Sequence, residues 1–112
     1  MSTTYYVYII KSLTNGVYYK GISTDVYRRL EEHNKGLSKY TSAAMPWELV
    51  YVESHDSKHD ALVHEKKLKK NKREYIEWLI EQPSNELKNK YPVTVRRNPL
   101  LLRFFLFYSY KK

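Results

Sequence analysis

Along residues 5–81, hydrophobic positions alternate between strand-like and helix-like spacing. Residues 5–10 and 47–53 carry β-branched and aromatic side chains on both faces, which is typical of buried strands. Residues 17–22 resume strand character after the Asn15–Gly16 turn signal. Segments 5–10 and 17–22 are therefore predicted to form a β-hairpin.

The loop of this hairpin has two plausible lengths, Asn15–Gly16 alone or the four residues from Leu13 to Gly16. Both registers place Tyr8 and Tyr19 on the same face of the sheet, because side chains alternate along a strand. With the longer loop, Tyr8 faces Gly21, and the two tyrosines are diagonal neighbours roughly 7–8 Å apart.

Three other segments have apolar side chains at helical spacing and recognisable ends. We expect helices over residues 25–34, 58–70 and 72–81, and a loop without periodicity over 35–46. The predicted end signals are Ser23 or Thr24 and Gly36 around the first helix, Ser57 with Asp60 at the start of the second, and Pro83 after the third.

These elements predict an α+β fold, in which a small, mainly antiparallel three-stranded sheet is flanked by about three helices. The chain has 112 residues, enough for one domain with one modest core. We assign residues 1–83 to that domain and residues 84–112 to a C-terminal extension. All three phenylalanines fall between positions 104 and 107. An extra strand, a flexible tail, an interface or a reading-frame change would each produce that shift in composition.

The composition of the chain limits which binding partners and which kinds of chemistry are possible. The formal net charge of +8 favours a polyanionic partner, and nucleic acid is the first candidate. The chain contains no cysteine, which excludes disulfides, thiolate zinc sites and a cysteine nucleophile, and fits a reducing cytoplasm. The longest apolar run, residues 100–107, is too short to span a bilayer and is interrupted by Arg103, so we expect no membrane partner.

Two polar residues border the apolar stripe of the first predicted helix. Val26 and Leu30 mark its inward face, and Arg29 and His33 are four residues apart, so they lie on one side of the helix. On spacing alone, the simpler interpretation is an exposed pair on a solvated helix. The alternative is a pair that belongs to a functional site.

A carboxylate interrupts the apolar stripe of the second predicted helix. Ala61, Leu62 and Leu68 mark the inward face, and Glu65 occupies the position where that stripe would carry leucine. Burying a lone carboxylate is costly unless it is paired or binds a cation. A salt bridge to a nearby lysine and a metal-binding or catalytic role are equally open.

Tyrosines are too common in this chain to be informative one by one. There are twelve, and most are expected to pack their rings while the hydroxyl stays in contact with water. Tyr8 and Tyr19 become candidates for chemistry only if Arg29, His33 and Glu65 converge on the same surface.

The order of these residues resembles the GIY-YIG nuclease domain, which is found in intron homing endonucleases, some restriction enzymes and the bacterial excision-repair incision subunit. The resemblance covers roughly residues 5–81 and is nearest to the small stand-alone bacterial proteins of that superfamily. Tyr8 and Tyr19 are separated by eleven residues, as in the family. The matching positions are Tyr6-Val7-Tyr8 and Tyr19-Lys20-Gly21 for the two triplets, Arg29 for the signature arginine, His33 for the histidine of several branches, and Glu65 for the metal-binding glutamate.

The chain also departs from the family pattern. Tyr6 replaces the first glycine of the family's name, and Val7 and Lys20 replace the isoleucines of the two triplets. Side chains at these positions have packing roles in the family, so the replacements do not change the expected chemistry. Ile22 stands where the incision-subunit branch carries a lysine, so a different group must assist the attacking water here.

The resemblance implies a metal-dependent endonuclease that hydrolyses DNA phosphodiester bonds with one Mg²⁺ or Mn²⁺ ion. Glu65 would bind the ion as a hard oxygen ligand, and Arg29 would neutralise charge on the phosphoryl oxygens. Tyr8 or Tyr19 would activate water, and His33, expected to titrate near neutrality, would assist as proton acceptor or relay.

Phosphate contacts are expected from the basic residues, because such contacts supply affinity without sequence preference. The predicted nucleic-acid-binding residues are Lys20, Arg28, Lys66, Lys69, Lys70, Lys72 and Arg73. The DNA could be branched or damaged, and RNA is a further candidate. Two other functions stay open: a non-catalytic nucleic-acid-binding module of the same fold, and a basic protein-interaction domain. A protein partner or self-association through the C-terminal extension would suit the latter.

Overall fold

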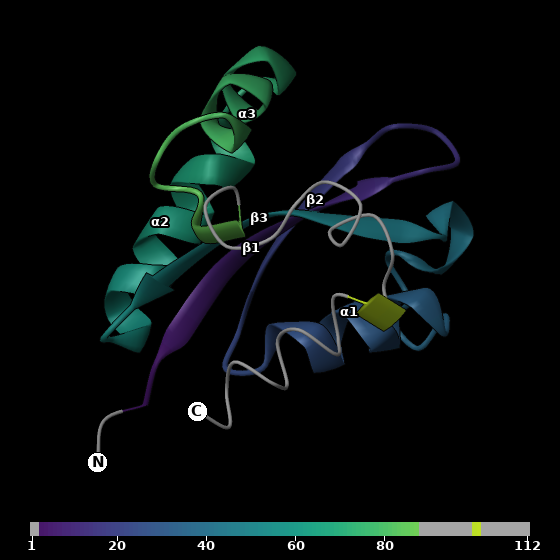
Figure 1. The fold of residues 1–112 in the computed structure, drawn as a ribbon, viewed down its shortest axis with the longest axis horizontal. Coiled ribbons are helices and arrows are strands. Elements are labelled where there is room, and N and C mark those ends of the chain that lie inside the picture. The colour runs from purple at the N-terminus through teal and green to yellow at the C-terminus, as the bar shows by residue number, and fades with distance from the viewer. Residues whose placement is uncertain (1–2, 88–99, 102–112) are drawn as a thin grey trace.

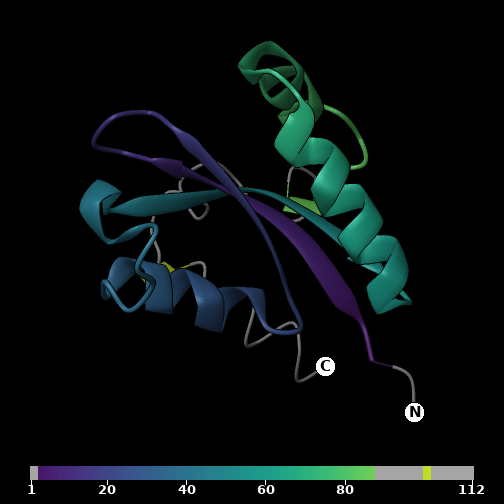
Figure 2. The same cartoon turned by 180° about the vertical axis from the view of Figure 1, so that it is seen from behind.

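The computed structural model describes residues 3–87 and 100–101. Its centre is a three-stranded antiparallel sheet of order β2-β1-β3. Figures 1 and 2 show α1 on one face of this sheet and α2 with α3 on the other. The predicted α+β fold with three helices is therefore confirmed. The elements are β1 (Tyr5–Ser12), β2 (Tyr18–Ser23), α1 (Val26–Asn34), the short 3-10 turn η1 (Ser42–Ala44), β3 (Trp47–His55), α2 (Lys58–Lys70) and α3 (Arg73–Ile80).

The β1–β2 hairpin adopts the longer of the two predicted loops. Tyr8 lies opposite Gly21, and Ile10 lies opposite Tyr19. Gly16 closes the loop with a φ of 77°, in the left-handed region where glycine carries no steric penalty. This register places both tyrosine side chains on the face of the sheet that α1 covers.

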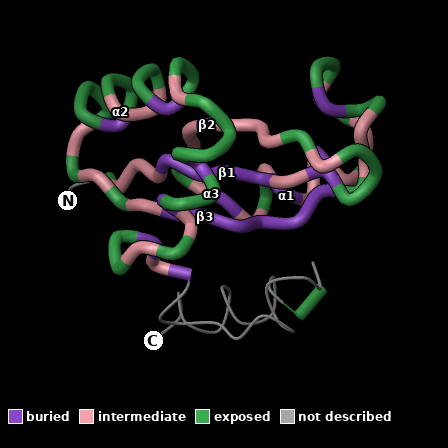
Figure 3. Tube along the Cα trace, turned by 90° about the horizontal axis from the view of Figure 1, so that it is seen from above, coloured by how far each residue is buried: buried purple, intermediate pink, exposed green. Residues whose placement is uncertain are grey.

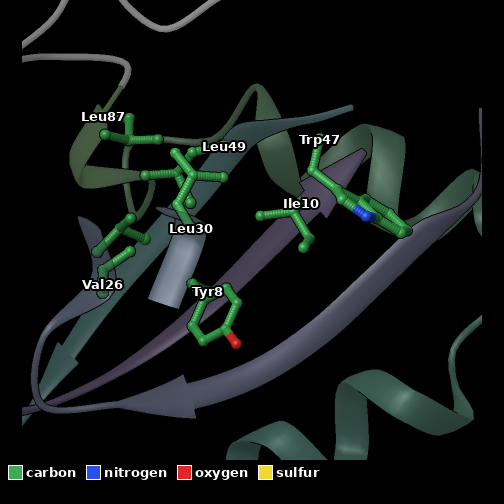
Figure 4. Close-up of a cluster of buried hydrophobic side chains, with 8 residues drawn as sticks. Tyr8, Ile10, Val26, Leu30, Trp47, Leu49 and Leu87 are labelled. Carbon is green, nitrogen blue, oxygen red and sulfur yellow. The ribbon is translucent and has the colours of Figure 1, made fainter. Parts of the chain in front are cut away.

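Each face of the sheet has its own apolar cluster. Figure 3 shows the buried stretches along the strands, and Figure 4 shows the cluster under α1. The cluster under α1 contains Tyr8, Ile10, Val26, Leu30, Trp47, Leu49, Val52 and Leu87. The cluster under α2 and α3 contains Val7, Ile9, Val50, Tyr51, Ala61, Leu68, Ile76 and Leu79.

One predicted core residue is on the surface. Leu62 is 42% exposed, although the sequence placed it on the inward stripe of its helix. Ala61 and Leu68, seven residues apart, are both fully buried and define a narrow line of contact along α2. Leu62 is rotated away from this line by about 100°, the turn of one helical residue, and therefore faces water.

The ends of the helices follow local hydrogen bonding. The predicted cap of α1 was wrong by one or two residues: Asp25 accepts a hydrogen bond from the Arg28 backbone N–H at 3.2 Å and is the N-cap. Ser23 instead accepts from the Asp25 N–H at 2.9 Å. The Ser57 cap is confirmed, since its hydroxyl accepts from the Asp60 N–H at 3.1 Å.

The described residues immediately beyond the predicted domain boundary pack onto the domain. The Asn85 amide donates to the carbonyls of Val50 and Ile80, both at 2.8 Å, and Leu87 is buried in the cluster under α1. Most of the predicted extension, 88–99 and 102–112, lies outside the described residues. Among the described helices, none is long and apolar enough to cross a membrane.

Candidate active site

Tyr8 lies at the centre of the site, on the middle strand. Its side chain is 1% exposed, and its ring lies over the backbone of Gly21 on the neighbouring strand. In Figure 4 the hydroxyl points away from the aliphatic side chains of the cluster under α1. The ring is thus fixed by packing while its oxygen is available for polar contacts.

His33 is the main partner of that hydroxyl. The Tyr8 Oη and the His33 Nε2 are 2.9 Å apart, and the His33 Nδ1 is 2.7 Å from the Thr41 hydroxyl oxygen. His33 is fully buried, so the interpretation as a solvated surface pair was wrong for this residue. The reason is helical spacing: the buried residues of α1 are Val26, Leu30 and His33, so His33 continues the apolar stripe.

Arg29 decides the direction of the hydrogen bonds. Its guanidinium donates to the Tyr8 hydroxyl oxygen and can only donate. This favours the tautomer in which Tyr8 donates to the His33 Nε2 and the His33 Nδ1–H donates to the Thr41 hydroxyl oxygen. In this arrangement the Tyr8 hydroxyl and both nitrogens of His33 have hydrogen-bond partners.

Burial controls the protonation of both groups. It raises the pKa of Tyr8 to about 12, although the Arg29 hydrogen bond and charge pull it down. Burial also lowers the pKa of His33 to about 4, and the positive charge of Arg29 adds to the effect. At neutral pH the site therefore holds a neutral phenol and a neutral imidazole. The expectation that His33 titrates near neutrality was wrong, because a buried imidazole resists protonation.

Tyr19 completes this group from the edge strand. Its ring lies edge-on to His33 with centroids 5.1 Å apart, and edge-on to Trp47 with centroids 6.4 Å apart. Tyr19 is half-buried, whereas Tyr8 is buried. The structure thus brings together four of the five predicted catalytic residues through direct contacts.

Arg29 is held by a residue that the sequence analysis did not select. Its Nη1 donates to the Glu32 carboxylate at 2.6 Å, an i,i+3 contact along α1. The Arg29 side chain is partly exposed, so its charge faces both Tyr8 and solvent. An acidic residue three positions after the signature arginine was the available signal for this anchor.

Glu65, the fifth predicted residue, approaches from α2. Its side chain is 13% exposed, and its charge is close enough to Tyr8 to raise the pKa of that phenol. The predicted lysine salt bridge is present: the Lys69 Nζ lies 3.7 Å from the Glu65 Oε2. That lysine is more than half exposed and the contact is long, so this ion pair is weak.

The donor chemistry of Glu65 fits a magnesium-like ion. Mg²⁺ prefers oxygen ligands and keeps several waters, so one carboxylate with waters and a substrate phosphate can complete its shell. Within the described residues, the one group of three neighbouring ligating side chains lies elsewhere, at Glu53, His55 and His64. The sequence analysis missed this group, although Glu53 and His55 share one face of a strand.

The predicted nucleic-acid-binding residues come from several elements. Lys66, Lys69 and Lys70 are exposed on α2, and Lys72 is exposed just after it. Arg28 is exposed on α1, whereas Lys20 on β2 is half-buried, and burial lowers the pKa of its amine.

Arg73 contacts the β1–β2 hairpin in the free protein. Its guanidinium donates to the Gly16 carbonyl at 2.8 Å and lies over the Tyr18 ring, 4.9 Å from the ring centroid. These contacts tie the start of α3 to the β1–β2 hairpin.

The family model of the GIY-YIG catalytic domain matches residues 4–78, the segment that contains the sheet, the helices and the cluster around Tyr8. The chain belongs to the GIY-YIG family. It is 39% identical over 82 residues to a UPF0213 protein of Streptococcus agalactiae, a match that covers 72% of this chain and 92% of the relative. It is 42% identical over 77 residues to a UPF0213 protein of Halobacterium salinarum, covering 68% of this chain and 99% of the relative.

A solved structure supports the same assignment. The solution NMR structure of a UPF0213 protein from Bacillus halodurans is similar, with a TM-score of 0.51 at 32% identity, and the match covers 80% of this chain and 96% of that chain. These three proteins are thus little longer than the segment that they share with this chain. The resemblance to small stand-alone GIY-YIG proteins is confirmed.

Proposed function

We propose that this protein is a metal-dependent endonuclease that hydrolyses DNA phosphodiester bonds. The observation that carries the proposal is the Tyr8 hydroxyl, held between a guanidinium and a neutral imidazole, with the Glu65 carboxylate within electrostatic range. A binding module alone would not need this arrangement, because phosphate affinity requires only positive charge.

Hydrolysis requires that a water oxygen bonds to phosphorus while the ester bond to the leaving oxygen breaks. Tyr8 is protonated at neutral pH, so it can take a proton from water only by passing its own to the His33 Nε2, 2.9 Å away. Tyr19, the more exposed tyrosine beside the same imidazole, would donate a proton to the leaving oxygen.

Two positively charged groups would stabilise the negative charge of the phosphate. Arg29 is permanently protonated, is oriented by Glu32 and Tyr8, and would neutralise the phosphoryl oxygens. Glu65 would hold one Mg²⁺ or Mn²⁺ ion. When bound, that ion would supply Lewis-acid polarisation of the phosphate.

Substrate binding is assigned to the basic surface around α2. Lys66, Lys69, Lys70 and Lys72 would contact backbone phosphates, with Lys20, Arg28 and Arg73 as further contacts. Such contacts position the duplex but do not distinguish sequences. We therefore propose a structure-selective or weakly specific nuclease that acts on branched or damaged DNA in the cytoplasm, where a partner protein would help to target it.

A plasmid-nicking assay with Mg²⁺, Mn²⁺ or chelator tests the proposal, followed by a panel of linear, nicked, flap and branched DNAs and matched RNAs. We expect metal-dependent cleavage that is lost in Glu65→Gln, which keeps the size of the side chain and removes its charge. DNA binding should survive. Glu74→Gln on the exposed side of α3 is the matched control and should cut normally.

The contrary results are informative. A fully active Glu65→Gln variant would remove Glu65 from the site. Binding without cleavage of any substrate would favour a non-catalytic module of this fold. Failure to bind DNA or RNA at low salt would favour a protein-interaction domain.

A further inference from the structure

A second polar cluster lies where the end of β3 meets α2, on the face of the sheet opposite α1. Glu53 and His55 are alternate residues of β3, so their side chains share one face, and His64 reaches them from α2. One ligand atom from each residue lies within 4.8 Å of the other two. All three side chains are less than one-third exposed.

Both imidazoles are directed at a single oxygen atom. The His55 Nε2 lies 2.6 Å from the Glu53 Oε1, and the His64 Nδ1 contacts the same Oε1. The His64 Nδ1 is nevertheless buried without a directed hydrogen bond among the described residues. A buried polar atom in this state is unfavourable and calls for a further partner.

The other oxygen of the Glu53 carboxylate, Oε2, already accepts a hydrogen bond. The buried Tyr51 hydroxyl donates to the Glu53 Oε2 at 2.6 Å and is 3.4 Å from the Ser84 hydroxyl. This contact fixes the orientation of the carboxylate and leaves Oε1 for a ligand, as outer-shell groups do at metal centres.

We propose that Glu53, His55 and His64 form a divalent-metal site that binds Zn²⁺ through Oε1, Nε2 and Nδ1, with water in the fourth position. Two imidazoles and one carboxylate suit zinc, whereas Mg²⁺ prefers oxygen ligands. Tetrahedral coordination at zinc–ligand distances near 2.0 Å separates ligand atoms by roughly 3.3 Å. The three atoms therefore need only small movements to surround an ion.

This site is distinct from the one proposed at Glu65. His64 and Glu65 are neighbours on α2, but consecutive helical side chains point about 100° apart. His64 reaches β3, whereas the charge of Glu65 reaches Tyr8. A zinc ion would fasten β3 to α2 next to Glu65. The inference does not depend on the proposed nuclease activity.

Zinc titration of the full chain, prepared without a histidine tag, tests the inference. We expect one Zn²⁺ per chain by calorimetry and a higher unfolding temperature, reversed by chelator. Long-range ¹H–¹⁵N spectra of the four histidines should show coordination by the His55 Nε2 and the His64 Nδ1, with His33 and His59 unchanged. This NMR measurement uses the wild-type chain, so it does not depend on whether a variant folds. No zinc binding, or perturbation of His59 instead, would overturn the inference.

Zinc affinities of single-residue variants distinguish the proposed zinc ligands from residues that only lie near them. His55→Gln and His64→Gln should each weaken zinc binding by about 100-fold or more, and Tyr51→Phe by roughly 10-fold, because it loses only the hydroxyl that orients Glu53. His59→Gln, an exposed histidine on the same helix, is the control and should bind zinc normally. Equal affinities across all four variants would contradict the site.

Glu65→Gln distinguishes this inference from the proposed function. It should lose Mg²⁺-dependent cleavage and keep zinc binding. If it loses zinc binding while His55→Gln and His64→Gln keep it, the ion belongs at Glu65 and the inferred site is wrong. If wild type binds zinc through His55 and His64 but cuts no substrate, the inference stands and the nuclease proposal fails.

Discussion

The ring of Tyr8 occupies the space that a side chain at Gly21 would need. The two residues are direct partners across β1 and β2, and a Cβ on Gly21 would lie 2.5 Å from both the Cζ and the Oη of Tyr8. The glycine of the second signature triplet thus allows the tyrosine of the first to lie flat across the edge strand and reach His33.

Gly21→Ala should therefore displace Tyr8. A methyl group at this position forces the ring from its contact with His33, since the strand backbone on the other side cannot yield. We expect a loss of about 1–3 kcal/mol in unfolding free energy, measured by urea titration, and strongly reduced DNA nicking. Thr24→Ala, an exposed change just beyond β2, should alter neither. An active, stable Gly21→Ala protein would show that the Tyr8 position is not critical.

Removing each tyrosine hydroxyl should have unequal effects. Tyr8→Phe leaves the buried His33 Nε2 without its 2.9 Å partner, so we expect it to cost about 1–3 kcal/mol of stability. It should also reduce single-turnover cleavage by roughly 10²–10⁴-fold. Tyr19→Phe retains the ring contacts with His33 and Trp47 and should stay as stable as wild type, with a smaller loss of rate. A larger rate loss in Tyr19→Phe than in Tyr8→Phe would instead assign water activation to Tyr19.

His33 should make stability depend on mildly acidic pH. Its folded-state pKa is about 4, below the usual 6.5, so the unfolded chain binds more protons between these values. The contribution of His33 is complete above pH 6.5 and is lost as the pH falls toward 4, at up to about 1.4 kcal/mol per pH unit. Urea unfolding between pH 7.5 and 4.5 measures this slope.

His33→Gln is the comparison for that slope. It retains the other three histidines and all carboxylates, so their contributions cancel in the difference. The variant should start less stable at pH 7.5 and lose less stability on acidification. Parallel curves for the two proteins would mean that His33 titrates equally in the folded and unfolded states.

The basic surface of α2 should determine the salt dependence of DNA binding. Lys66→Ala with Lys70→Ala should reduce the slope of log K against log salt by about 2, one unit for each lost phosphate contact. The loss should be similar for unrelated DNA sequences. Lys35→Ala, at the end of α1 and paired with Glu31, is the control. Fluorescence anisotropy at several salt concentrations measures the slopes, and an unchanged slope would move the DNA surface elsewhere.

Local patterns were sufficient for most of the fold. The strand and helix positions followed from residue spacing, the Ser57 cap was correct, and α2 has the predicted bounds of 58–70. The longer hairpin loop was one of two open registers, and only strand pairing selected it. Five candidate site residues could be selected because their order along the chain resembles a family.

The environment of each side chain could not be read from spacing. His33 was interpreted as half of a solvated pair, but α1 presses it against the sheet, where Tyr8 and Thr41 satisfy its nitrogens. Leu62 was placed inward and faces water. Both outcomes depend on how each helix is rotated about its axis relative to the sheet. Packing between the elements sets that rotation.

The sequence by itself determined which segments become strands and helices, and which residue types are available for chemistry, because spacing, caps and turns act within a few neighbouring residues. Tertiary structure alone decided that the Tyr8 ring lies over Gly21, that burial holds His33 neutral, and that Glu53 and His55 meet His64. These properties arise from desolvation and contact between segments distant in the chain, and they exist only once the sheet and helices have packed.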